Sequence, residues 1–74
     1  MPTHELPALR AREVVSALER AGFRQVRQRG SHLQLKRGNL LVTVPVHPGD
    51  LNPQVVRSIL RQARLSAEEL LNLL

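Results

Sequence analysis

The chain has 74 residues, which is enough for one small domain, and its lack of cysteine excludes disulfides, thiolate catalysis and cysteine-based zinc sites. The formal net charge of +5 favours a nucleic acid, an acidic protein or an anionic membrane as the partner. Phe23 is the only aromatic residue, so the chain does not suit folds that bind single strands by stacking bases on aromatic rings.

The N-terminal part of the chain carries no signal for a membrane or for secretion. It has no apolar segment of the kind found in signal peptides, and no apolar run approaches the ~20 residues that cross a bilayer. We therefore expect a cytoplasmic protein with no membrane partner and no small-molecule cofactor. Residues 1–9 contain two prolines and show no hydrophobic period, so we interpret them as a lead-in to a single domain that spans residues 1–74.

A helical period and a glycine predict the first helix and its end. Apolar residues between positions 10 and 21 recur at helical spacing and form one stripe. Gly22 follows, and glycine commonly adopts the left-handed conformation that ends a helix. Phe23 comes next and is placed to fold back onto the stripe.

Three short strands are expected after this helix, at residues 23–28, 32–36 and 40–44. Glycine-containing turns separate them, and Pro45 ends the third strand because proline cannot donate to a ladder.

The inward and outward sides of the strands follow from alternation. Val26 is the inward candidate of the first strand. In the second strand Leu33 and Leu35 alternate with His32 and Lys36. If the two leucines face the helices, His32 must face outward.

Two further helices are expected at the C-terminal end. Asn52 can cap the first of them, Pro53 suits its first turn, and an apolar stripe extends to Ala63. Ser66 and Glu69 have the spacing of a capping box, and the leucines after them must pack on the core or on another protein. The sequence therefore predicts an α+β domain in the order α-β-β-β-α, with a three-stranded antiparallel sheet, helices on one face and a short C-terminal helix.

A histidine in a basic segment is the main functional signal. Six Arg or Lys residues and no acidic residue occur between Arg20 and His47. His32 lies in this segment, directly after Gly30 and Ser31, and imidazole exchanges protons near neutral pH. Positive charge attracts a polyanion, and RNA carries its own nucleophile in the 2′-hydroxyl beside each phosphate. RNA cleavage by His32 is therefore one hypothesis, and an ordinary exposed strand residue is the alternative.

The other candidate residues also have two interpretations each. Gly30 can serve the turn or let a phosphate approach the backbone, and Ser31 can bind a phosphate or close the turn. His47 is either a second catalytic or phosphate-binding residue or a residue that stabilises its loop. His4 and the other two histidines lack close ligand spacing, so no metal site is expected. The basic side chains form either an RNA footprint or a solvated surface: Arg24, Arg27, Arg29, Lys36, Arg37, Arg57 and Arg61.

Four short motifs in a fixed order resemble the HicA family of bacterial and archaeal toxins. They are Ala21-Gly22-Phe23, Arg29-Gly30-Ser31-His32, Val44-Pro45-Val46-His47, and Arg57-Ser58-Ile59-Leu60 with Gln62-Ala63. This resemblance implies a fold like the double-stranded-RNA-binding domain. It also implies a toxin that cleaves mRNA without a metal, an mRNA interferase, and a HicB antitoxin as its partner.

The resemblance also implies roles for particular residues. The catalytic histidine of the family falls on His32, and the Gly and Ser that precede it fall on Gly30 and Ser31. The Pro-x-His element of the family falls on Pro45 to His47. Family members often carry an aromatic residue or a second histidine soon after the catalytic one, whereas this chain has none there. Two alternatives stay open: a non-catalytic RNA-binding module of the same fold, and a protein-interaction module with an acidic partner.

Overall fold

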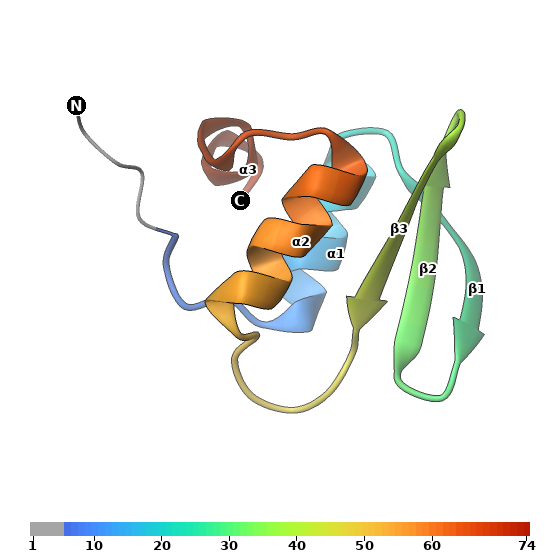
Figure 1. Ribbon diagram of the computed structural model, residues 1–74, viewed down its shortest axis with the longest axis horizontal. Coiled ribbons are helices and arrows are strands. Elements are labelled where there is room, and N and C mark those ends of the chain that lie inside the picture. The colour runs from blue at the N-terminus through green and yellow to red at the C-terminus, as the bar shows by residue number, and fades with distance from the viewer. Residues whose placement is uncertain (1–5) are drawn as a thin grey trace.

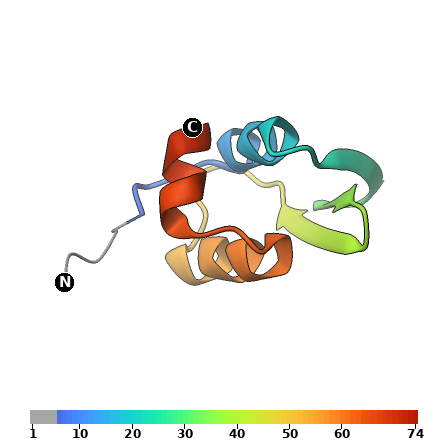
Figure 2. The same ribbon diagram turned by 90° about the horizontal axis from the view of Figure 1, so that it is seen from above.

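The computed structural model describes residues 6–74, and its elements follow the predicted order (Figure 1). The helices are α1 (Ala11–Arg20), α2 (Pro53–Ala63) and α3 (Ala67–Leu73). The strands are β1 (Arg24–Arg29), β2 (His32–Arg37) and β3 (Leu40–Pro45), and they form one antiparallel sheet in the order β1-β2-β3. The helices lie on one side of this sheet, with α3 beside one end of α1 and α2 (Figure 2). The predicted α-β-β-β-α order with an additional C-terminal helix is confirmed.

The hydrophobic core lies between the helices and the inner face of β2 and β3. Leu33 and Leu35 of β2 are buried, and Val42 and Val44 of β3 are completely inaccessible to solvent. These side chains pack in one cluster with the apolar stripes of α1 and α2 and with Phe23. Burial of apolar surface stabilises such a fold by roughly 25 cal/mol per Å². The predicted inward side of β2 is therefore confirmed.

Local hydrogen bonds cap the N-terminal ends of α2 and α3 as predicted. The Asn52 side chain accepts a hydrogen bond from the Gln54 N–H at 2.8 Å. Ser66 and Glu69 form the capping box, because each side chain accepts from the other residue's backbone N–H at 3.0 Å. The backbone N–H and then the hydroxyl of Ser66 lower the pKa of the Glu69 carboxyl. Leu70 of this short helix is buried, so its apolar face packs on the core.

The prediction that Val26 faces inward is wrong. The Val26 side chain is 51% exposed, and the pairing of β1 with β2 shifts register between Gln25 and Arg27. A β-bulge at this point inserts one extra residue, which resets the alternation of side chains along the strand. All six residues of β1 are exposed.

The second half of the lead-in belongs to the folded domain. Leu9 is buried, and its carbonyl accepts a hydrogen bond from the Leu51 N–H at 2.7 Å. Arg10 forms an isolated antiparallel bridge with Asp50. The lead-in thus holds the loop between β3 and α2, which carries His47. His4 lies outside the described residues.

Candidate functional site

His32 begins β2 directly after a two-residue turn formed by Gly30 and Ser31. Arg29 and His32 face each other across this turn. Gly30 has φ +55°, and the space in front of it is open, so backbone conformation is the reason for glycine here. The Gln28 side chain donates to the Gly30 carbonyl at 3.0 Å and supports the turn. The imidazole is thus held on a short hairpin at one end of the sheet.

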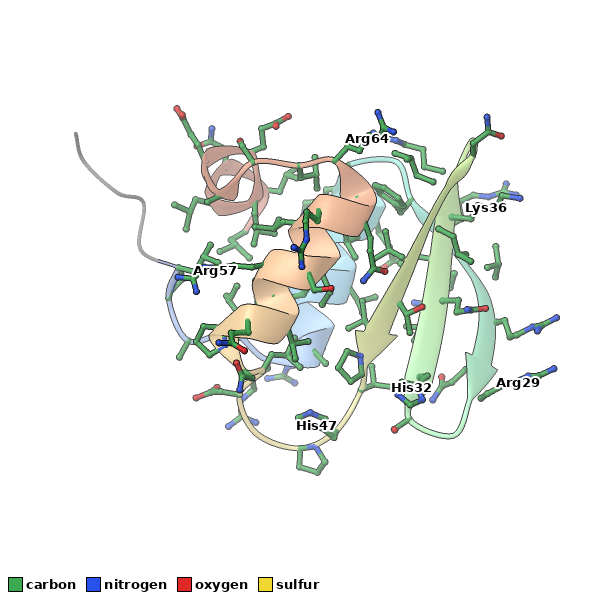
Figure 3. The ribbon with its side chains drawn as sticks, viewed as in Figure 1. Arg29, His32, Lys36, His47, Arg57 and Arg64 are labelled. Carbon is green, nitrogen blue, oxygen red and sulfur yellow. The ribbon has the colours of Figure 1, made fainter. Side chains whose placement is uncertain are left out.

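A backbone hydrogen bond joins this turn to the loop after β3. The Val46 N–H donates to the Ser31 carbonyl at 2.6 Å, and Pro45 is the cross-strand neighbour of His32. Two motifs that are more than a dozen residues apart in the sequence therefore lie side by side. Figure 3 shows His32 and His47 at the same end of the molecule.

The outer face of the sheet, which the helices leave uncovered, has a hollow of about 300 Å³ around His32. Arg27, Arg29, Gln34 and Thr43 line it together with His32. The His32 side chain is exposed and forms no hydrogen bond or ion pair within residues 6–74. Its imidazole is therefore accessible to a ligand.

The bulge in β1 gathers arginines on this outer face. Arg24, Arg27 and Arg29 pair with Lys36, Gln34 and His32 of β2, so they lie on the His32 side of the sheet. In a regular strand Arg24 would point to the opposite face from Arg27. The segment from the start of β1 to the end of β3 contains no acidic residue. The hollow is thus bordered by fixed positive charge without a compensating carboxylate from the strands.

His47 lines a different hollow. It lies in the loop after β3, and a groove of about 610 Å³ separates this loop and the inner side of β1 from α1. Its Nδ1 is 3.0 Å from the Pro48 carbonyl, which can only accept a hydrogen bond. Nδ1 therefore carries a proton, and Nε2 is the atom left for another contact. None of the residues that line this groove lines the hollow around His32.

The predicted basic footprint divides into separate parts. Arg57 and Arg61 line a shallow hollow on α2 with Gln54, and Figure 3 shows Arg57 far from His32 on the helix side. Arg37 has a structural role. Its guanidinium lies 4.8 Å from the centre of the Phe23 ring and donates to the Ala21 carbonyl at 2.6 Å. Only the β1 arginines and Lys36 share the outer face with His32.

Sequence reasoning did not single out two residues of the His32 hollow. Gln34 lies beside His32 on the same side of β2. Thr43 of β3 is the cross-strand neighbour of Gln34. Alternation predicted that Gln34 faces outward, but only the pairing of β2 with β3 brings Thr43 to it. Both supply groups that can hydrogen-bond to a ligand in the hollow.

Within residues 6–74, no three side chains of the His, Asp or Glu type are grouped so that they could hold a metal ion. No helix of this part of the chain is both long and apolar enough to cross a membrane. The groups that form the His32 site are an imidazole, guanidinium groups and a backbone turn.

One known protein family matches this chain. The family model described as the HicA toxin of bacterial toxin-antitoxin systems matches residues 11–65, a range that runs from the start of α1 to just beyond α2. No curated protein matches the chain. The match covers most of the 74 residues and includes both the His32 turn and the His47 loop. Family membership implies an antitoxin as a partner. The chain belongs to the HicA toxin family.

Proposed function

We propose that the protein is the toxin of a toxin–antitoxin pair and acts in the cytoplasm as an mRNA interferase, a metal-independent endoribonuclease with His32 as its acid–base group. The observation that carries this proposal is the exposed, unpartnered imidazole of His32 in a hollow bordered by Arg27 and Arg29. A proton-exchanging group beside fixed cations meets the two needs of phosphodiester cleavage.

The chemistry uses the nucleophile that RNA supplies. The 2′-oxygen attacks the adjacent phosphorus while its proton passes to the neutral His32 imidazole. The bond between phosphorus and the 5′-oxygen then breaks, and the imidazolium returns the proton to that leaving oxygen. The products are a 2′,3′-cyclic phosphate and a 5′-hydroxyl. One imidazole can serve both transfers in turn, and His47 is the alternative acid. General acid–base catalysis of this kind contributes roughly 10²–10⁴-fold.

The arginines stabilise the charge that develops on phosphorus. The phosphate oxygens gain negative charge as the 2′-oxygen attacks, and guanidinium groups can bind them in bidentate fashion. Arg27 and Arg29 border the hollow, and Arg24 and Lys36 extend the positive face along the sheet. Gly30 and Ser31 hold the turn and leave open space in which the RNA backbone can approach.

We also propose that a HicB-like antitoxin inhibits the toxin by covering this outer face. An acidic surface would pair with the same arginines that bind phosphate, so RNA and antitoxin would compete.

The decisive experiment compares the wild type with His32→Ala on an end-labelled single-stranded RNA in the presence of EDTA. His4→Ala serves as the matched control, because it removes an imidazole that belongs to none of the four motifs, and His47→Ala tests the alternative acid. We expect wild type to cleave and to leave a 2′,3′-cyclic phosphate, and His32→Ala to bind RNA but lose at least a hundredfold in rate, roughly the lower end of an acid–base contribution.

Each other outcome has a definite meaning. A fully active His32→Ala protein would exclude His32 from the chemistry. Binding without cleavage by the wild type would indicate a non-catalytic RNA-binding module, which needs the arginines but not His32. Absence of RNA binding would leave the acidic protein partner as the main ligand.

A further inference from the structure

A second hollow is the groove between α1 and the His47 loop. Its volume is about 610 Å³, which lies within the roughly 300–1,000 Å³ range of small-molecule sites. Its apolar side chains come from α1, β2 and the loop, namely Ala11, Val15, Leu33 and Val46. Its polar side chains come from α1, β1 and the loop, and they include Arg12, Ser16, Gln25 and His47.

This groove lies on the other side of the strand that carries His32. Leu33, which lines the groove, is the next residue after His32 and points to the opposite face of β2. Val46, which also lines the groove, donates its backbone N–H to the Ser31 carbonyl in the turn before His32. A chain of nucleotides that passes the exposed end of the sheet can therefore contact both sides of the same turn.

The composition of the groove suits a nucleobase. A base has two apolar faces and an edge of donors and acceptors, and the groove combines apolar side chains with the hydroxyl of Ser16 and the amide of Gln25. Bases usually stack on aromatic rings or on guanidinium planes. The one aromatic ring of the chain, Phe23, is buried, so the available planar groups here are the guanidinium groups of Arg10 and Arg12 and the His47 imidazole.

Charge favours RNA as the occupant of the groove. Arg10 and Arg12 lie along it, and Glu19 is its only acidic residue. We propose that the groove is a base-binding subsite. It holds the base of a nucleotide next to the scissile phosphate, and it thereby sets the nucleotide preference of cleavage. This inference rests on the proposed function and gives His47 a role in substrate contact.

The first test fills the groove. Gln25 is exposed, and a strand position tolerates an aromatic residue, so Gln25→Trp should fold and occupy the groove. Gln54→Trp on α2 is the matched control, since Gln54 lies in a separate hollow. On a mixed-sequence RNA pool we expect Gln25→Trp to change the nucleotides found beside the cuts and to raise KM roughly tenfold, the scale of one lost base-stacking contact. The control should match the wild type.

A second test does not depend on cleavage. The His32→Ala protein is irradiated with a single-stranded RNA that carries 4-thiouridine, and the crosslinked peptides are identified. We expect crosslinks in α1 and in residues 45–51. Such crosslinks would support the subsite even if the wild type cut no RNA, which separates this inference from the proposed function.

Three results would overturn the inference. One is a set of crosslinks confined to the outer face of the sheet. Another is an unchanged cleavage preference and KM in Gln25→Trp. The third is a Gln25→Trp protein that keeps its cleavage preference but loses the antitoxin, which would assign the groove to the protein partner.

Discussion

Strands β1 and β3 both form an edge of the sheet, but they differ in how much of each strand is buried. On β3, Val42 and Val44 are completely buried against the helices, and the Thr43 N–H donates to the Gln62 side chain of α2 at 3.0 Å. On β1 every residue is exposed, and a bulge interrupts the strand at Val26. We call β3 the packed edge and β1 the open edge.

The difference separates stability from recognition. The packed edge contributes buried apolar surface, and α2 binds one of its backbone N–H groups. The open edge contributes little to the core, so its side chains are free to serve a ligand, and three of the six are arginines. Arginines and a bulge also hinder pairing with the same strand of a second copy, because like charges would face each other.

The largest expected effect is the loss of ligand binding at the open edge. The double variant Arg27→Glu, Arg29→Glu should bind RNA roughly a hundredfold more weakly, since each charged hydrogen bond is worth about 1.5–3 kcal/mol. The salt dependence should become shallower by about 0.7 for each lost phosphate contact. The antitoxin should also bind more weakly. Fluorescence titration over a range of salt concentrations measures these effects.

Charge reversal on α2 is the matched control for this double variant. Arg57→Glu, Arg61→Glu changes the same number of charges on a surface away from His32. An equal loss of RNA binding in the α2 variant would show that RNA extends onto the helix side. Retained antitoxin affinity in the β1 variant would contradict a shared surface.

The next largest expected effect is on stability, and it is tested by replacing a valine with alanine at each of the two edges. Val44→Ala should lower the free energy of unfolding by about 2 kcal/mol, because it removes buried methyl groups and leaves a cavity. Val26→Ala should change it by no more than about 0.5 kcal/mol, since Val26 is half exposed. Urea unfolding monitored by circular dichroism measures both. Similar losses at the two positions would mean that the open edge is a structural element after all.

The smallest expected effect concerns the hydrogen bond that closes the packed edge. Gln62→Ala removes the acceptor of the Thr43 N–H and should cost about 0.5–1 kcal/mol. Hydrogen exchange at the Thr43 amide should become faster. Gln28→Ala on the open edge is the control, because it removes a side-chain hydrogen bond to the turn without touching β3. Unchanged exchange at Thr43 in Gln62→Ala would indicate that α2 does not protect this edge.

Much of the fold could be predicted because local patterns and packing agree. The alternation in β2 correctly predicts that Leu33 and Leu35 are buried and that His32 faces outward. Val26 was assigned inward for the same reason, and a bulge made that assignment wrong. A bulge depends on how two strands pair, so one strand's alternation does not reveal it. The lack of a hydrophobic period in residues 1–9 predicts that Leu9 belongs to the lead-in, whereas Leu9 is buried in the structure and bonds to the loop before α2.

The candidate site was predictable in part. The Gly30-Ser31-His32 turn and the basic side chains were visible in the sequence, but their arrangement in space was not. Arg37 carries the same charge as Arg27, but it lies on the same side of β2 as Leu35, where its guanidinium stands over the Phe23 ring. The sequence leaves open whether His47 is a second catalytic or phosphate-binding residue or a residue that stabilises its loop, and in the structure it lines a different hollow from His32.

The sequence by itself determined the order of the elements, the inner face of β2, the helix caps and the location of His32 on a basic hairpin. These features follow from period, capping and turn chemistry, which act between residues close in the chain. The tertiary structure alone decided which arginines share a face with His32, that the Ser31 and Val46 backbones are joined, and that a groove lies beside His47. Those features depend on strand register and on helix-to-sheet packing, which are set by contacts between distant segments of the chain.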